Sequence, residues 1–185
     1  MQPAPRETIA PPDSLIEKLI PGCDFHDAWA VPAGSPGLTA LGQFLKAAGQ
    51  TPRWVSACMA LRNRVVSLFG LKDLGGLEQL PRHKAEADYR PGDRVGIFTL
   101  FENTPGEVLL GDRDRHLDVT LSVHLTPPPA GGATLVSLTT VVRVHNLLGR
   151  VYMLPVTPMH RLIAPAVLRA VARPSCHATS ASAAP

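Results

Sequence analysis

Apolar and polar residues alternate along much of the second half of the chain, between residues 95 and 145. In the clearest run every second side chain is apolar and its neighbours are polar: Leu117, Val119, Leu121, Val123 and Leu125 against Asp118, Thr120, Ser122 and His124. This period of two predicts strands over residues 95–101, 107–110, 116–125 and 133–145. One apolar and one polar face are typical of an antiparallel sheet. The Pro- and Gly-rich residues 127–132 predict a hairpin loop.

The first half of the chain carries mostly helical patterns. Three short segments are recognisable: a strand at residues 24–31 and helices at residues 13–19 and 39–48. A better-specified helix begins at Pro52, with Thr51 as its cap, and closes at Gly70. Its apolar residues recur at helical spacing, and we expect this stripe to face a core: Trp54, Cys58, Leu61, Val65, Leu68 and Phe69.

Residues 158–173 predict one more helix, with Thr157 as the N-cap and Pro158 at the first helical position. Its main apolar stripe consists of Met159, Leu162, Ile163, Ala166 and Ala170. Apolar side chains on so much of its circumference indicate that the helix is largely covered. A strand, two helices, several strands and a long helix, in that order, predict an α+β fold. In it a curved antiparallel sheet closes over the C-terminal helix.

The composition is that of a globular protein, with 45% hydrophobic and 18% charged residues among 185. We expect one domain over residues 13–173 and unstructured tails, rich in Pro, Ala and Ser, over residues 1–12 and 174–185. The net charge of +3 comes from scattered Lys and Arg residues. Without a concentrated basic face, we expect no nucleic-acid partner.

Cysteines 23, 58 and 176 stand far apart, in a pattern that fits neither a disulfide framework nor a zinc site. The N-terminus lacks the apolar core of a secretory signal. The most apolar stretch, residues 151–172, is interrupted by charged residues and prolines, so we expect no membrane span. These features predict a cytoplasmic protein of bacterial type, with no metal and no cofactor.

Several stretches resemble one protein family: PGCDFHDAW (21–29), PRWV (52–55), LRNR (61–64), LGDRDRHLD (110–118), HNLLGR (145–150) and PMH (158–160). They are similar to DUF2867, an uncharacterised family, and the similarity covers residues 21–172. The resemblance implies the START-like, Bet v1-like or SRPBCC superfamily, and with it a helix-grip fold around an apolar cavity. Related folds bind lipids, sterols or aromatic products, or act as cyclases.

Some members of this family look fused to a dehydrogenase-like nucleotide-binding domain, which suggests an oxidoreductase as a partner. The present chain has no GxGxxG motif after a strand. The resemblance therefore implies no dinucleotide site here.

Four ionisable residues stand at alternate positions: Asp112, Asp114, His116 and Asp118. On a strand, this spacing would project all of them from one face. Carboxylates and an imidazole so arranged can bind a divalent cation or act as an acid/base pair. Because Arg113 and Arg115 lie between them, the alternative is a solvated hairpin with ion pairs, which we favour.

His145 and Asn146 end the longest predicted strand, and Arg150 follows closely. These residues can hold a carboxylate or carbonyl of a ligand at a cavity mouth. Alternatively, His145 and Asn146 cap the strand end and turn the chain.

His160 and Arg62 are candidates on two of the predicted helices. His160 can point into the cavity as an acid or base, or be a core histidine bonded to the backbone. Arg62 can extend to water or reach a buried carboxylate such as Asp118.

These patterns support two hypotheses. In the first, a non-enzymatic module binds a hydrophobic molecule, lipid-like or aromatic, in the cavity. In the second, a cyclase- or hydratase-like enzyme uses His145 or His160 to move a proton and Arg62 or Arg150 to stabilise an oxyanion. The predicted ligand-binding residues are Arg62, His116, Asp118, His145, Asn146, Arg150 and His160.

Overall fold

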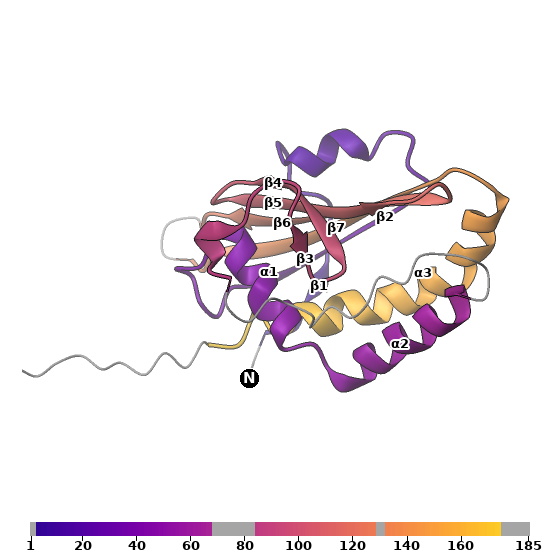
Figure 1. The fold of residues 1–185 in the computed structure, drawn as a ribbon. Coiled ribbons are helices and arrows are strands. Elements are labelled where there is room, and N and C mark those ends of the chain that lie inside the picture. Colours follow the sequence, from indigo (N-terminus) through magenta and orange to yellow (C-terminus); the bar gives the residue numbers. More distant parts are fainter. Residues whose placement is uncertain (1–2, 68–83, 129–131, 175–185) are drawn as a thin grey trace, which may run out of the picture.

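Figure 1 shows the computed structural model, which describes residues 3–67, 84–128 and 132–174. An antiparallel sheet of seven strands runs through it in the order β1-β2-β7-β6-β5-β4-β3. The strands are β1 (Arg6–Glu7), β2 (Phe25–Pro32), β3 (Arg94–Val95), β4 (Phe98–Asn103), β5 (Glu107–Arg113), β6 (Leu117–Thr126) and β7 (Leu135–Val144). The predicted strands are confirmed, except that the segment at 95–101 is divided at Gly96, whose φ is +60°.

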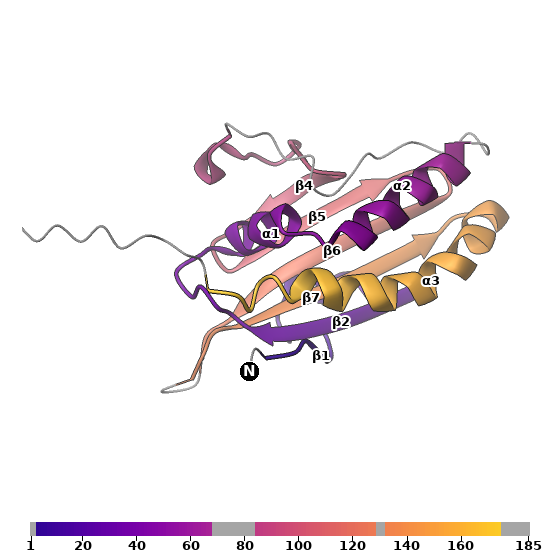
Figure 2. The same ribbon diagram turned by 90° about the horizontal axis from the view of Figure 1, so that it is seen from below.

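The α-helices of the described residues lie on one face of the sheet, and a short 3-10 helix lies on the other (Figures 1 and 2). The helices are η1 (Leu15–Leu19), α1 (Ala40–Gly49), α2 (Arg53–Ser67), η2 (Glu86–Asp88) and α3 (Leu147–Leu168). Figure 2 shows α2 and α3 extending side by side over the strands. The α+β prediction is therefore confirmed, and the arrangement is that of a helix-grip fold.

The sheet places β2 next to β7, although the two strands lie far apart in the sequence. β2 pairs with β7 along its whole length, and in this register Asp27 lies opposite Thr140. β7 in turn pairs with β6, where Leu121 is opposite Thr140. Residues from β2 and from β7, the strand before α3, thus form one continuous surface beneath α3.

Both faces of the central strands are covered. On the helical face, buried strand residues such as Val31 and Leu110 pack in one cluster with Leu41 of α1. On the opposite face, Ile16 of η1 is fully buried and packs with Leu109 of β5. This double burial leaves the sheet exposed mainly at its edges and ends.

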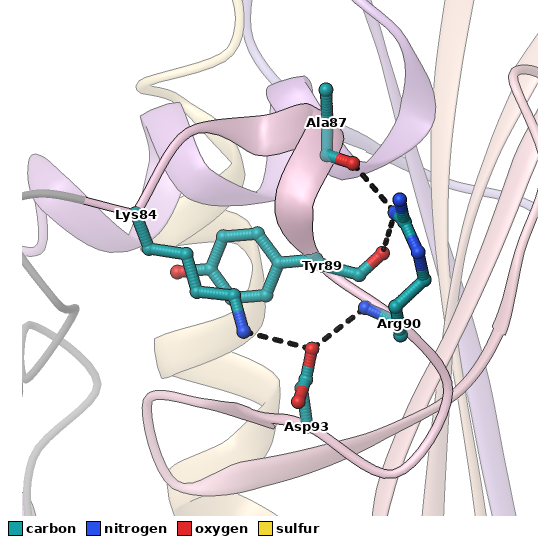
Figure 3. A network of polar contacts seen from close by, with 5 residues as sticks. All are labelled: Lys84, Ala87, Tyr89, Arg90 and Asp93. Carbon is teal, nitrogen blue, oxygen red and sulfur yellow. Dashed lines mark hydrogen bonds and ion pairs between the residues drawn. The ribbon is translucent and has the colours of Figure 1, made fainter.

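A polar network before β3 holds the loop that leads into the sheet (Figure 3). Lys84 Nζ lies 2.8 Å from Asp93 Oδ2, which also accepts the Arg90 backbone N–H at 2.7 Å. These two bonds hold the pKa of Asp93 below its ordinary value of 3.8. The Arg90 guanidinium donates to the carbonyls of Ala87 and Tyr89. The network surrounds Tyr89, whose buried ring lies 4.6 Å from the Lys84 ammonium.

The N-terminal segment departs from the prediction of an unstructured tail over residues 1–12. β1 pairs with β2 as an edge strand, and the Thr8 N–H donates to the Ala28 carbonyl at 2.9 Å. A two-residue polar edge strand has no alternation of apolar and polar residues, so its sequence does not indicate a strand. Residues 175–185 of the predicted C-terminal tail lie outside the described residues, as does Cys176.

The last helix begins earlier than the sequence predicted. Its first residue is Leu147 rather than Pro158, and its N-cap is Asn146 rather than Thr157. The Asn146 Oδ1 accepts the Gly149 N–H at 3.1 Å, which satisfies one of the free donors of the first turn. The predicted start was wrong because three prolines lie inside the helix: Pro155, Pro158 and Pro165.

The prolines are tolerated because of where they lie on α3. Each proline removes a bond to the carbonyl four residues earlier, which belongs to Val151, Leu154 and Arg161. All three residues are exposed, with Val151 at 54% and Leu154 at 74%. Water can therefore donate to the freed carbonyls, and the helix continues.

The apolar stripes of α2 and α3 are less buried than predicted. Trp54 and Leu61 of α2 are 44% and 64% exposed, and Leu162 of α3 is 60% exposed. Their apolar positions are therefore divided between the interior and the exterior. The predicted positions Leu68, Phe69 and Gly70 and the side chain of Val65 lie outside the described residues. No α-helix in the described part of the chain has the length and apolarity needed to span a bilayer.

Candidate functional site

A cavity of about 500 Å³ lies between the sheet and the three α-helices. Its floor is made by alternate residues of the strands, because only one side of each strand faces the helices. The apolar part of the wall includes Phe98, Val119, Leu121, Leu138 and Val142 from the sheet, Met59 from α2, and Met153, Val156, Met159 and Ile163 from α3. Small-molecule sites are hollows of this size, with mostly apolar walls and a few polar groups.

A buried polar cluster joins β2, β7 and α3 beside this cavity. The His160 Nε2 lies 3.1 Å from Asp27 Oδ1 and 3.1 Å from the Thr140 hydroxyl. The Trp29 indole N–H donates to the other carboxylate oxygen of Asp27 at 3.0 Å. Phe25 packs edge-on against the imidazole, with ring centroids 5.7 Å apart. These contacts fix the His160 ring in the cavity wall.

The environment of Asp27 favours its ionised form. Burial by itself raises the pKa of this carboxyl, but the hydrogen bond and positive charge of His160, with bonds from Trp29 and Thr140, outweigh burial. The pKa of Asp27 therefore lies below its ordinary value of 3.8. An ionised carboxylate only accepts hydrogen bonds, so His160 Nε2 carries a hydrogen and donates it. Among the described residues, none bonds to Nδ1 of His160, which is left for another partner.

Arg62 and Tyr152 connect α2 to α3 at the cavity wall. The Arg62 Nε–H donates to the Tyr152 hydroxyl oxygen at 2.9 Å, and the guanidinium carbon lies 5.5 Å from the ring centroid. Of the two alternatives for Arg62, the contact with Asp118 is not formed, and Asp118 Oδ1 pairs with His145 Nε2. The Arg62 head is held by an aromatic ring rather than by an acid.

His116 and Asn146 meet where the β5–β6 turn approaches the start of α3. The Asn146 side chain lies 3.0 to 3.2 Å from His116 Nδ1, and its amide donates to the Arg115 carbonyl at 3.0 Å. Gly149 packs so closely here that a Cβ would come within 2.3 Å of the His116 carbonyl oxygen. The HNLLGR stretch therefore contains a helix cap and the small residue that lets α3 contact this turn.

The four alternating ionisable residues do not share one face, so that prediction is wrong. Asp112 is the last residue but one of β5, Asp114 and His116 lie in the turn, and all three line the cavity. Asp118 is in β6 and pairs in register with Arg113, on the other face of the sheet. The physical reason is the turn, which interrupts the strict alternation that a single strand would have.

This region is a hairpin, but the contacts of Asp112 and Arg113 differ from those of the favoured solvated alternative, since Asp112 is buried and its ion pair is with Arg94 of β3. Arg94 lies 3.4 Å from Asp112, and the Arg113 guanidinium packs 5.0 Å from the Phe101 ring centroid. Within the described ranges no group of three or more His, Cys, Asp or Glu side chains is arranged to hold a metal ion.

His145, Asp118 and Arg150 lie away from the cavity wall. His145 Nε2 and Asp118 Oδ1 are 3.2 Å apart, and both side chains are more than 30% exposed. Arg150 is an exposed residue of the first turn of α3. Of the predicted ligand-binding residues, the cavity wall thus contains Arg62, His116 and His160, with Asn146 bonded to His116.

Sequence reasoning missed Asp27, Thr140, Tyr152 and Gln43 in this region. Asp27 had a signal, because it shares one face of the predicted strand with Phe25 and Trp29, and a carboxylate between aromatic residues requires a partner. Gln43 of α1 had none, since it lies among apolar residues of a helix buried on most sides. Its Oε1 is buried without a hydrogen-bond partner, while its Nε2 donates to the Ser35 carbonyl at 2.8 Å.

Comparison with known protein families matches residues 19–167 to the family described as "Protein of unknown function (DUF2867)". The match extends over more than half of the 185 residues and includes β2, all later strands and nearly all of α3. No curated protein and no solved structure gives a significant match to the chain.

Proposed function

Because the chain belongs to DUF2867, a family described only as having an unknown function, we propose a function from the cavity itself. The protein binds an apolar small molecule, lipid-like or aromatic, between the sheet and helices α2 and α3. The observation that carries the proposal is the cavity of about 500 Å³ with its mostly apolar wall. Burying apolar ligand surface in such a space is favourable by about 25 cal/mol for each Å² removed from water.

The superfamily assignment is part of the same proposal. Three features support the START-like, Bet v1-like or SRPBCC group: β2 pairs with β7, α1 and α2 separate β2 from the later strands, and α3 crosses the sheet last. This order leaves α3 as the cover of a space that the strands line. A solved structure of the protein with a molecule under α3 would place the chain among these ligand-binding folds.

Binding is tested on the whole purified chain by native mass spectrometry and organic extraction. We expect an adduct that disappears on extraction and an apolar compound in the organic phase. Delipidated protein should then bind an apolar fluorescent dye with saturable, one-site behaviour. The proposal would be contradicted if the purified protein carried no extractable compound and the delipidated protein did not bind the dye.

A matched pair of variants on α3 connects binding to the cavity. Val156 lines the cavity, whereas Val151 is 54% exposed and does not. Val156→Phe places a larger side chain in the ligand space and should weaken dye binding at least about tenfold, the effect of losing about 1.4 kcal/mol. Val151→Phe should leave binding unchanged. Equal affinities in the two variants would place the bound dye outside the cavity.

A second candidate function is proton transfer by His160 within a cyclase- or hydratase-like reaction. The observation that favours it is the Asp27–His160 pair, in which a buried carboxylate orients an imidazole in the cavity wall. When the imidazole is neutral and its one hydrogen, on Nε2, is held by Asp27, the Nδ1 atom is the one that can accept a proton from a bound molecule and return it. Arg62 is the remaining candidate for stabilising an oxyanion, since Arg150 lies outside the cavity wall.

The enzymatic alternative is separated from simple binding by following the extracted compound over time. Conversion by the wild-type chain, lost in His160→Gln while the compound still binds, would support it. Recovery of the compound unchanged from both proteins would leave only the binding function. An oxidoreductase partner stays a prediction, which a pull-down from cell extract with the full chain can examine.

A further inference from the structure

The hydrogen-bonded pair Arg62–Tyr152 places a cationic group, the guanidinium, in the mostly apolar wall of the cavity. We propose that this pair binds the carboxylate of an amphipathic acid whose apolar chain occupies the cavity. The inference rests on the proposed function and adds to it the chemical class of the ligand.

The hydrogen bonds of the pair leave donors that can serve a further partner. Arg62 uses Nε–H on the Tyr152 oxygen and one Nη1–H on Asn63 Oδ1 at 2.8 Å. A guanidinium has five N–H donors, so others remain, including both on Nη2. The Tyr152 oxygen accepts from Arg62, which leaves its own O–H to donate. Two residues from different helices therefore present hydrogen-bond donors at one place.

The charge of Arg62 has no acidic partner among the residues that the structure describes. Asp112 and Asp114 also line the cavity, from β5 and the following turn, but neither forms an ion pair with Arg62. Asp112 is paired with Arg94 at 3.4 Å. A half-buried guanidinium without a counterion is unfavourable, and a carboxylate matches its planar donors best.

The neighbouring wall explains why the acid should carry an apolar chain. On the same two helices as the pair, Met59 of α2 and Met153 and Val156 of α3 line the cavity, and Val119 lines it from β6. Methionine side chains adapt to ligands of different shape. An anionic head on Arg62 and an apolar chain along this wall would satisfy both parts of the site, whereas a small hydrophilic anion would satisfy only the first.

The test compares dodecanoate with methyl dodecanoate, which has the same chain but no charge, by calorimetry at neutral pH. We expect the wild-type chain to bind dodecanoate about tenfold or more tightly than the ester, the difference expected from a charge-assisted hydrogen bond. Arg62→Met replaces the apolar stem of the side chain, removes the guanidinium and should abolish this preference without weakening ester binding. Tyr152→Phe keeps the ring and should reduce the preference severalfold.

Arg150→Met is the control, because Arg150 is exposed on α3 outside the cavity wall and its loss should leave both affinities unchanged. If Arg62→Met fails to fold, judged by circular dichroism, Tyr152→Phe decides the question. Equal binding of acid and ester by the wild type, or a preference unchanged in the variants, would overturn the carboxylate site while cavity binding stands. Failure of the wild type to bind either probe would overturn this inference, whereas the extraction and dye experiments decide the proposed function separately.

Discussion

The carboxylate of Asp27 and the imidazole of His160 are 3.1 Å apart, although 133 residues separate them in the chain. The contact joins the first long strand to the last helix across β7, whose Thr140 bonds to the same imidazole nitrogen. It therefore links the element that covers the cavity to the sheet that forms its floor. Its effect on stability and on pH dependence can be measured without knowing the ligand.

Asp27→Asn should destabilise the fold by about 1–3 kcal/mol, because it weakens a buried acceptor that serves His160, Trp29 and Thr140. The Asp27 side chain is only 5% exposed. Asp118→Asn is the control, since Asp118 pairs with His145 but is 33% exposed, and it should change stability by less than about 1 kcal/mol. Urea unfolding of the two variants measures both values. Equal losses would mean that the Asp27 cluster contributes no more than a surface pair.

The contribution of Asp27 should disappear in acid. Its pKa is lower in the folded chain than the ordinary 3.8, so the folded state favours the ionised form. The stabilisation is then fully present above the unfolded pKa and is lost as the pH falls through the lower, folded pKa. The stability difference between wild type and Asp27→Asn should shrink as the pH falls below about pH 4. A difference that grows on acidification would contradict the assigned direction of the shift.

Asn146→Ala should destabilise the protein by about 1 kcal/mol or more, because α3 loses its N-cap bond to Gly149. The variant also loses the contacts of the Asn146 amide with His116 and the Arg115 carbonyl. Asn146→Asp retains a capping oxygen with favourable charge for a helix N-terminus and should recover most of the stability. Thermal unfolding distinguishes the two. If both variants lose stability equally, the contacts with the β5–β6 turn matter more than the cap.

Gly149→Ala should destabilise the protein even though it lies in a helix, where alanine is ordinarily better than glycine by about 1 kcal/mol. The added Cβ would come within 2.3 Å of the His116 carbonyl oxygen, so α3 and the turn must separate. An overpacked contact of this kind costs about 1–3 kcal/mol. Gly49→Ala is the matched control at the end of α1, where a Cβ meets nothing within 4 Å. That change should be neutral or stabilising in the same unfolding assay.

Local patterns were sufficient for most of the secondary structure. The alternation over residues 116–125 corresponds to β6 (Leu117–Thr126), and the helical pattern over residues 39–48 to α1 (Ala40–Gly49). Whether such a segment is a strand or a helix depends on the spacing of its apolar residues, which can be read directly from the sequence. The grouping of strands after two helices likewise predicted the α+β class, because consecutive strands pair readily with their neighbours.

The start of α3 could not be predicted from local sequence patterns. Proline usually marks a helix start, so the sequence pointed to Pro158 as its first position. The helix starts at Leu147 because Asn146 caps it and Gly149 packs against the β5–β6 turn. The carbonyls freed by the prolines belong to residues that the folded chain leaves exposed. Exposure of those positions depends on what the rest of the chain covers.

The sequence by itself determined most of the elements, the fold class and the polar residues available to a site. Only the tertiary structure decided which of these residues meet: His160 with Asp27, Arg62 with Tyr152, and His145 with Asp118 outside the cavity wall. The reason is that periodicity reports the side of an element on which a residue lies, whereas contacts between distant segments depend on strand register and helix placement. Here the pairing of β2 with β7 and the position of α3 above them select the residues that face the cavity.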